Sequence, residues 1–256
     1  MVSRVLRNSI FLRIYAGLVV LVVVVAAFCY LLVQVINYQR AQEYRESLTD
    51  GISYVISEGV SRQPQKQQKL DWISDASDLL ELPIYYVDAE RVELSRTEKK
   101  RIAEQKSVVR YDANNGVGYI IIGLKDDAKH YLYIKVDKLG ERQMKALPIF
   151  VLDYLIFYPG QEREYLERIK KHFYYPITIA SIKDINLDSE QIGRLRQDQS
   201  ILLYKDSATV RGTTISIVSP MPNHPTQVLI LGPVPMFNWM PFQLAAGITL
   251  FSLFLL

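Results

Sequence analysis

The chain has 256 residues, of which 49% are hydrophobic and 22% are charged, and it carries a formal net charge of +3. Arg4, Arg7 and Arg13 are the only charged residues before Arg40, and none follows Arg211. The other 27 basic residues (30 less these three) equal the 27 acidic ones, so the middle segment is formally neutral. This partition excludes a simple soluble globule, and the charge balance excludes a basic nucleic-acid-binding surface.

An apolar run near the N-terminus predicts a membrane helix. Residues 14–39 contain no Asp, Glu, Lys or Arg, and their centre reads LVVLVVVVAAF. About 20 apolar helical residues cross a hydrocarbon core of roughly 30 Å. A cleaved signal peptide would have a shorter apolar region and a small-residue cleavage site, and a lipoprotein would need a small residue in place of Phe28 before Cys29. A buried soluble helix would need a larger core than the polar middle segment supplies.

A second apolar run, Phe237–Leu256, predicts a second membrane helix. Trp239 stands near its start, where aromatic rings favour the headgroup zone. A C-terminal core helix is the alternative, but the end of the run has no polar face beyond Thr249 and Ser252. Since a helix that ends in lipid leaves its last carbonyls unsatisfied, we expect the sequence to be cut short of a further region. The N-terminal arginines predict a cytoplasmic N-terminus and an outer middle segment.

The middle segment contains an internal repeat. Gln68–Tyr111 aligns without gaps with Gln161–Tyr204, at a spacing of 93 residues. Ser95-Arg-Thr-Glu98 reads as a capping box, and Asp188-Ser-Glu-Gln191 occupies the equivalent place. A repeat at fixed spacing indicates one structural unit used twice. The identical pairs are Gln68 and Gln161, Pro83 and Pro176, Ile84 and Ile177, Leu94 and Leu187, Arg101 and Arg194, Ser107 and Ser200, and Tyr111 and Tyr204.

Each unit is predicted to contain a helix, a strand, a short capped helix and three more strands. Consecutive strands joined by short turns predict antiparallel sheets, and helices packed on one face of each sheet make the fold class α+β. The expected helices are 67–81, 96–105 and 189–197. The expected strands are 84–88, 108–111, 117–122, 131–137, 177–180, 201–204, 213–219 and 227–232.

The same patterns divide the whole chain. Residues 37–60 keep helical periodicity and should continue the first membrane helix outward, with a loop at 61–69. The apolar segment 139–158 is interrupted by Pro148, and Gly232-Pro-Val-Pro235 is either an ordinary turn or a stiff coupling to the second span. The expected parts are a cytoplasmic tail (1–13), a first transmembrane helix (14–36), a membrane-proximal helix and loop (37–66), a first α+β unit (67–160), a second α+β unit (161–235) and a second transmembrane helix (237–256).

The sequence contains no catalytic, cofactor-binding or metal-binding constellation. His130, His172 and His224 have no Cys or His at metal-ligand spacing, so packing or surface roles are expected. Asp126-Asp127 is expected to be a solvated pair at a strand turn, with a cation contact as the alternative. Lys99-Lys100-Arg101 is expected to be a solvated helix face, with an anion contact as the alternative.

The 17 tyrosines are unusually many. Tyr85, Tyr86, Tyr131 and Tyr133 could line a ligand pocket, because tyrosine offers apolar area and a polar tip. Core or interface packing is the alternative. Without catalytic groups, the middle segment is expected to receive a signal and not to carry out a reaction.

The junction Leu229-Ile-Leu-Gly-Pro-Val-Pro235, with the aromatic stretch and apolar span that follow it, resembles RstB-type two-component sensor histidine kinases of Gram-negative bacteria. The stretches at 10–23, 36–60, 80–89 and 236–244 are similar to the biofilm-regulating sensors of this type. The resemblance covers essentially the whole chain, although RstB-type sensors carry a single unit of the kind repeated here. It implies a membrane-anchored extracytoplasmic α+β sensor, with two tandem PAS- or Cache-like units between two transmembrane helices.

The resemblance also implies a function. Such kinases are homodimers in the bacterial inner membrane; they sense a periplasmic ligand, phosphorylate their own histidine from ATP with Mg²⁺, and pass the phosphate to a cognate response regulator. None of His130, His172 and His224 begins a His-Glu-x-x-x-Pro box, and the HAMP and kinase regions are absent, so no catalytic, cofactor or metal residue is carried over. Two alternatives stay open: the ligand-binding part of a chemoreceptor or cyclase, and a non-catalytic membrane-anchored envelope protein.

Overall fold

A computed structural model describes residues 10–112, 115–137, 140–207, 212–234 and 247. The chain divides into two units, one formed by residues 1–43 with 237–256 and the other by Tyr44–Met236. The predicted tail at 1–13 and the predicted second membrane helix at 237–256 lie largely outside the described residues.

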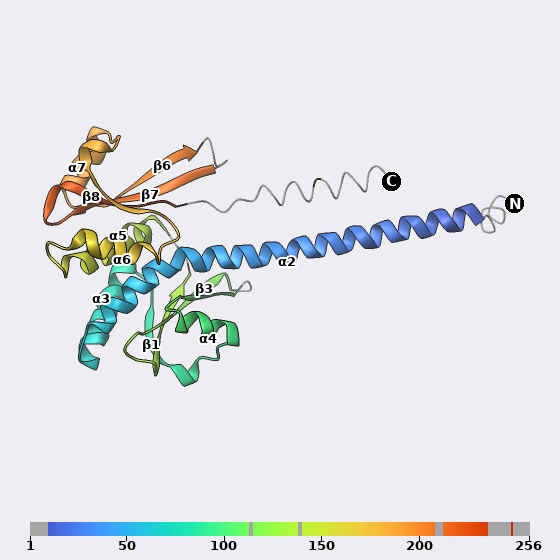
Figure 1. Ribbon diagram of the computed structural model, residues 1–256, viewed down its shortest axis with the longest axis horizontal. Helices are drawn as coiled ribbons and strands as arrows, with labels where there is room; N and C mark the ends of the chain where they lie inside the picture. Colours follow the sequence, from blue (N-terminus) through green and yellow to red (C-terminus); the bar gives the residue numbers. More distant parts are fainter. Residues whose placement is uncertain (1–9, 113–114, 138–139, 208–211, 235–246, 248–256) are drawn as a thin grey trace. The chain divides into compact units, whose positions relative to one another are not determined.

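The N-terminal helix α2 (Ile10–Ser61) is unbroken over 52 residues (Figure 1). By length and composition it can cross a membrane, because it contains an 18-residue window of mean hydropathy 3.0, none of which is buried in the protein. Among the described residues it is the one helix that meets this criterion. The apolar run expected to span a membrane and its expected outward continuation therefore belong to a single helix.

Two four-stranded antiparallel sheets follow, in the orders β1-β4-β3-β2 and β5-β8-β7-β6. The predicted α+β class and the eight predicted strands are confirmed, with shifted ends. The largest shifts are at β8, which begins before Gln227 and continues past Gly232 to Val234, so part of the Gly-Pro-Val-Pro link is strand. The strands are β1 (Ile84–Asp88), β2 (Val108–Asp112), β3 (Val117–Gly123), β4 (His130–Val136), β5 (Ile177–Ser181), β6 (Ile201–Ser207), β7 (Gly212–Met221) and β8 (His224–Val234).

Five more helices complete the described chain. The loop predicted at 61–69 is shorter than expected, because α3 begins at Lys66 with the Gln65 N–H donating to Gln68 Oε1 at 3.4 Å. These helices are α3 (Lys66–Leu80), α4 (Arg96–Ala103), α5 (Glu141–Ile156), α6 (Glu162–Lys170) and α7 (Ser189–Arg196), with short 3₁₀ turns at Ala89–Arg91 and Ile182–Asp184.

Helix α5 continues through Pro148, where the sequence predicted an interruption. Proline inside a helix removes one backbone hydrogen bond and costs about 3 kcal/mol. Pro148 is itself buried, and Phe150, Val151 and Leu155 of the same helix are at most 5% exposed. Burial of this apolar face offsets the proline penalty, because each fully buried large apolar side chain contributes about 1.5–3 kcal/mol.

The predicted repeat is a structural one. β1 and β5, α4 and α7, and β2 and β6 each start 93 residues apart, and the two sheets share one strand order. Both expected capping boxes form, at Ser95 with Glu98 and at Asp188 with Gln191. Even the left-handed turn residue recurs, with φ of 58° at Gln105 and 56° at Asp198.

The two repeats share one hydrophobic core. The inner face of each sheet packs against a layer made of the C-terminal part of α2 (residues 44–61) together with α3, α5 and α6 (Figure 1). Gly51 and Gly59 allow α2 to pack closely on its neighbours within this layer. A Cβ at Gly51 would lie 2.3 Å from the Phe173 ring, and a Cβ at Gly59 would lie 2.5 Å from the Trp72 ring. The most buried members of this core are Val60, Leu132, Val151, Leu155, Ile169, Leu229 and Leu231, each at 0% exposure.

The outer face of each sheet is covered by its own short helix. In the second repeat, Leu195 of α7 packs with Ile201, Val218 and Val228 in a small separate cluster. In the first repeat, Ile102 of α4 lies against Gly123 of β3. In each repeat the sheet therefore lies between the shared helical layer and one short helix of its own, α4 in the first repeat and α7 in the second.

Candidate functional site

The C-terminal part of α2 presents a polar stripe to the first repeat. Glu46, Asp50 and Ser57 are separated by four and seven residues, so they share one helix face. The Ser57 hydroxyl donates to the carbonyl of Gly123, at the end of β3, over 2.8 Å. Because polar groups in an apolar surrounding are costly unless hydrogen-bonded, the carboxylates of this stripe require partners from the facing repeat.

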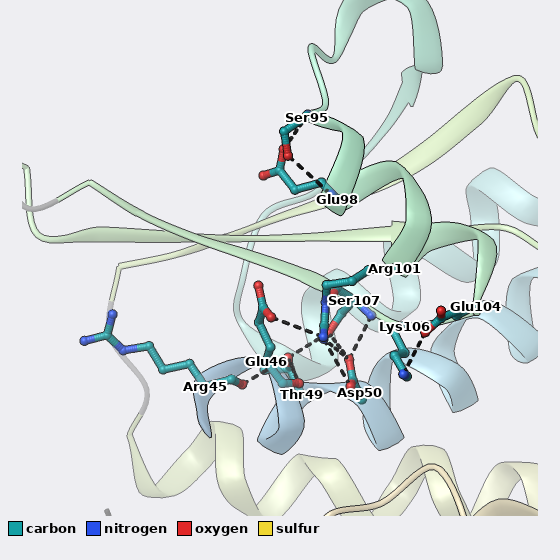
Figure 2. A network of polar contacts seen from close by, with 10 residues as sticks. All are labelled: Arg45, Glu46, Thr49, Asp50, Ser95, Glu98, Arg101, Glu104, Lys106 and Ser107. Carbon is teal, nitrogen blue, oxygen red and sulfur yellow. Dashed lines mark hydrogen bonds and ion pairs between the residues drawn. The ribbon is translucent and has the colours of Figure 1, made fainter. Parts of the chain in front are cut away.

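Arg101 of α4 binds both carboxylates of the stripe (Figure 2). Its Nη1 lies 3.2 Å from Glu46 Oε2, and its Nη2 donates to the two Asp50 oxygens at 3.0 and 3.2 Å. Only 12%, 15% and 21% of the Glu46, Asp50 and Arg101 side chains are exposed. Solvent screens these charges little, so the contact contributes more than an exposed ion pair.

Ser107, just before β2, completes the binding of Asp50. Its backbone N–H and its hydroxyl each lie 2.9 Å from Asp50 Oδ1, and the Thr49 hydroxyl is 2.8 Å from the Ser107 hydroxyl. Arg101 Nε donates to the Ser107 carbonyl at 2.9 Å, which joins the two residues directly. The Arg101 guanidinium with the N–H and hydroxyl of Ser107 forms a carboxylate cradle, and α2 supplies the carboxylate.

The turn after α4 brings the two halves of the cradle together. Gln105 takes a left-handed φ of 58°, the Gln105 N–H donates to the Ile102 carbonyl, and the Lys106 N–H donates to the Arg101 carbonyl, both at 3.0 Å. This bond pair is a Schellman motif, which reverses the chain tightly at a helix C-terminus. The motif returns the backbone at Ser107 to the side chain of Arg101.

The start of α4 is tied to the sheet. The Ser95 N–H donates to Glu98 Oε2 at 2.7 Å, and the Glu98 N–H donates to Ser95 Oγ at 3.3 Å. Glu98 also accepts from Arg110 of β2, at 2.8 and 3.0 Å. The hydrogen bonds from Arg110, opposed by desolvation and reinforced by Ser95, lower the pKa of Glu98 to about 2. Glu98 is therefore ionised at neutral pH and fixes α4 on β2.

Aromatic rings hold the end of α2 and the residue that follows it. The Arg62 guanidinium carbon lies 4.3 Å from the centroid of Tyr154, 4.6 Å from Phe157 and 5.1 Å from Tyr158. Two helical turns before Arg62, Tyr54 of α2 stacks on His172, and the two ring centroids are 3.7 Å apart. Burial lowers the pKa of His172, which favours the neutral imidazole in this stack. The C-terminal part of α2 is thus bound to both repeats.

Arg101 is the functional residue that the sequence assigned wrongly. Lys99 and Lys100 are exposed, as predicted for a solvated helix face, but Arg101 turns inward to α2. The identities in the repeat already contained the signal, because Arg101 and Ser107 are both preserved after 93 residues while the neighbouring lysines are not. Its carboxylate partners lie outside the repeated segment, so no alignment of the two repeats could supply them.

The acidic pair expected to be solvated is instead bound. Asp126 pairs with Lys69 of α3, and Asp127 accepts from the Tyr86 hydroxyl and contacts His130 Nδ1 at 2.9 Å. Desolvation opposes the effect, but the bonds from Tyr86 and His130 leave the pKa of Asp127 below its usual value. These contacts fasten the β3–β4 turn to α3 and β1.

The four tyrosines proposed to line a pocket do not converge. Tyr85 pairs with Tyr133 across the β1–β4 ladder and shares one sheet face with Tyr131, whereas Tyr86 lies on the other face. Tyr86 stacks on His130, with ring centroids 4.4 Å apart. A groove of about 540 Å³ between α3 and β1 is lined by Tyr85 and Tyr86 alone of the four. The alternation of side chains along a strand separates residues that are neighbours in sequence.

The site is suited to holding a helix, because its donors converge on the carboxylates of α2. Within the described part of the chain, no group of three or more His, Cys, Asp or Glu residues is arranged to bind a metal ion. His224 is 45% exposed, 4.0 Å from Glu162, and belongs to no cluster with the other two histidines. No protein-family model matches the sequence, and no curated protein matches it significantly.

Proposed function

We propose that this chain is the signal-receiving, membrane-anchored part of a two-component sensor histidine kinase. In this proposal residues 44–236 lie in the periplasm, the two repeats are PAS- or Cache-like sensor units, and α2 and residues 237–256 cross the bacterial inner membrane. The receptor acts as a homodimer and responds to a periplasmic ligand. It requires a HAMP linker and a kinase region, with ATP and Mg²⁺, and a response regulator as partner.

The continuity of α2 is the observation that carries the proposal. One helix contains both the apolar stretch able to cross a membrane and the stripe bound by Arg101 and Ser107. A helix transmits displacement along its axis because its backbone hydrogen bonds are internal. A change in the first repeat that shifts α4 or the start of β2 would therefore move or release the helix on which the membrane stretch lies.

The cradle has the properties of a two-state contact. It consists of hydrogen bonds between half-buried charged groups, which are strong when formed and costly when one partner is lost. Such contacts have two discrete arrangements, made and broken, and this bistability is what a transmembrane signal needs. The capping box at Ser95 and the Glu98–Arg110 pair keep the receiving side rigid, so that strain is not absorbed within α4.

The proposal is tested by fusing residues 1–256 to the HAMP and kinase region of a sensor kinase and measuring autophosphorylation in membrane vesicles with ATP and Mg²⁺. Replacing Arg101→Gln should change the basal kinase activity about fivefold or more, since losing 1 kcal/mol or more from one of two states shifts their ratio by that factor. Arg96→Gln is the matched control: Arg96 lies on the same helix and is exposed.

Two results would contradict the proposal. The first is a fusion protein whose kinase activity is unchanged when residues 67–232 are deleted. The second is labelling of residue 115, on the β2–β3 turn, by membrane-impermeant reagents from the cytoplasmic side but not from the periplasmic side.

A further inference from the structure

The second repeat contains the same cradle as the first. Arg194 and Ser200 stand 93 residues after Arg101 and Ser107, and Asp198 takes the left-handed φ of 56° between them. The Schellman bonds recur as well: the Asp198 N–H donates to the Leu195 carbonyl at 3.1 Å and the Gln199 N–H to the Arg194 carbonyl at 3.0 Å. The backbone turn that brings an arginine and a serine to the same end of a short helix is therefore built twice, and in the second repeat both residues line one groove.

The two cradles differ in what faces them. Helix α5 stands before the second repeat as α2 stands before the first, but it brings Glu141 with Arg142 and Lys145 in place of Glu46 and Asp50. Lys145 already binds Glu141, at 2.6 Å. Within the described residues, Arg194 has no ion pair or side-chain hydrogen bond, and the Ser200 N–H has no backbone partner. The two basic residues that face it are already paired, Arg142 with Glu81 and Lys145 with Glu141, so the half-buried Arg194 guanidinium is the cation of this groove that has no ion pair among the described residues.

A groove of about 840 Å³ runs between α5 and the turn after α7, and the second cradle lines it. Its basic side chains are Arg142, Lys145 and Arg194, against Glu141 and Asp198. A second hollow of about 440 Å³ adjoins it, sharing Ile149, Asp198 and Ser200. That hollow is mainly apolar, and it is lined by Ile149, Leu152, Ile156, Pro220 and Pro222 together with Asp153, Asp198, Ser200 and Ser219.

We propose that this groove is a binding site for a small organic carboxylate with an apolar body. The carboxylate would lie on the Arg194 guanidinium and the Ser200 N–H, the counterparts of two of the three donors that bind Asp50 in the first repeat. The apolar body would lie in the adjoining hollow along Ile149 and Ile156, which are 41% and 37% exposed. Both hollows have the volume of small-molecule sites, about 440 and 840 Å³.

The geometry of the first cradle defines the fit. There a carboxylate is held at 2.9 Å by the serine N–H, at 2.9 Å by its hydroxyl and at 3.0 Å by the guanidinium. In the second repeat the Ser200 hydroxyl donates to the Ser219 hydroxyl at 3.0 Å, so the donors that remain for a carboxylate are the Ser200 N–H and the Arg194 guanidinium. An amide would lose the charge-assisted bonds that distinguish a carboxylate.

The test uses the full chain in lipid nanodiscs, with hexanoate and hexanamide as probes. Saturation-transfer NMR and the thermal midpoint should show saturable binding of hexanoate, and binding of hexanamide about tenfold weaker or more. Arg194→Gln should weaken hexanoate binding about tenfold or more without changing the fold. Arg196→Gln, on the same helix but exposed, should bind as the unaltered chain does.

A second variant keeps the test decisive if Arg194→Gln alters the fold. Gln199→Glu adds a carboxylate to the exposed turn that lines the groove with Arg194, outside the apolar hollow, so it should weaken hexanoate binding about tenfold or more while leaving hexanamide binding within about twofold. The proposal is overturned by equal binding of the two probes, by hexanoate binding that survives both substitutions, or by no saturable hexanoate binding. Binding is measured without any kinase region, so its failure is distinct from failure of the proposed receptor function.

Discussion

The first and second repeats have the same fold and the same turn after the short helix, with an arginine and a serine at matching positions. Only in the first repeat does this arginine–serine pair bind a helix. In the first repeat Arg101 and Ser107 bind Asp50 of α2; in the second, Arg194 and Ser200 line a groove beside α5. The position of the arginine–serine pair is set by local sequence, through a capped short helix and a left-handed turn residue. Its occupant is set by the helix that precedes each repeat. Duplication thus reproduces a binding element, and the flanking helix decides whether it serves an internal contact.

A second contrast concerns burial. Glu46, Asp50 and Arg101 form a contact in which no side chain is more than 21% exposed, whereas the ion pair on α5 between Glu141 and Lys145 leaves Glu141 60% exposed. Exposed pairs contribute about 0–1 kcal/mol, and half-buried pairs with extra hydrogen bonds contribute more. The free energy of unfolding should therefore depend much more on the contacts of Arg101 than on Arg194.

The largest expected effect is at Asp50. Asp50→Ala leaves Arg101 and the Ser107 N–H without their acceptor inside a packed region and should destabilise residues 44–236 by about 4 kcal/mol. Urea unfolding of the detergent-solubilised chain measures this. Asp75→Ala, at an exposed helical position, should change the free energy of unfolding by less than about 0.5 kcal/mol. Equal effects at the two sites would show that the cradle contributes nothing special.

The next effect tests whether the repeats share one core. Leu132→Ala, at a position with 0% exposure on the inner face of the first sheet, should cost about 3 kcal/mol. Amide hydrogen exchange should then quicken in β7 and β8 as well as in β3 and β4. Leu195→Ala, in the separate cluster under α7, should speed exchange mainly in α7 and β6. Exchange changes from Leu132→Ala confined to the first repeat would mean two independent cores.

The next largest effect comes from replacing the corresponding arginines of the two repeats, Arg101 and Arg194. Arg101→Gln should lower the free energy of unfolding by about 2 kcal/mol, because Asp50 and Glu46 lose a charged donor. Arg194→Gln should change it by less than about 0.5 kcal/mol, since Arg194 has no ion pair among the described residues. The two variants are compared by denaturation under identical conditions. A larger loss of unfolding free energy from Arg194→Gln than from Arg101→Gln would contradict this prediction.

The smallest effect depends on pH. The pKa of Glu98 is lowered in the folded protein to about 2, so its stabilisation is complete above its unfolded value near 4.5 and is lost as pH falls toward 2. Arg110 is 38% exposed, and solvent screening therefore limits the contribution to about 1 kcal/mol. Glu98→Gln should flatten the stability profile between pH 4.5 and 2 by that amount. Gln191, the corresponding residue of the second repeat, has no carboxyl group, so Gln191→Ala should leave the slope unchanged.

Much of the fold could be predicted because it rests on local signals. The strand starts at Ile84, Val108, Val117, Ile177 and Ile201 were placed correctly, since Pro83, Gly116 and the capped helices mark them. The apolar segment 139–158 does form a helix, α5, but the interruption predicted at Pro148 was wrong, because burial of one helix face offsets the proline penalty. The four tyrosines do not line one pocket, because Tyr86 lies on the opposite sheet face from Tyr85, Tyr131 and Tyr133.

The amino-acid sequence alone determined the apolar N-terminal helix, the α+β class and the 93-residue duplication. These follow from hydropathy, periodicity and turn chemistry, which act over a few residues. Only the tertiary structure decided that both repeats share a core, that Arg101 binds α2, and that Arg194 lines a groove. Those features depend on residues some 50 positions apart, as with Asp50 and Arg101, and the partner of a charged side chain is set by which helix packs beside it.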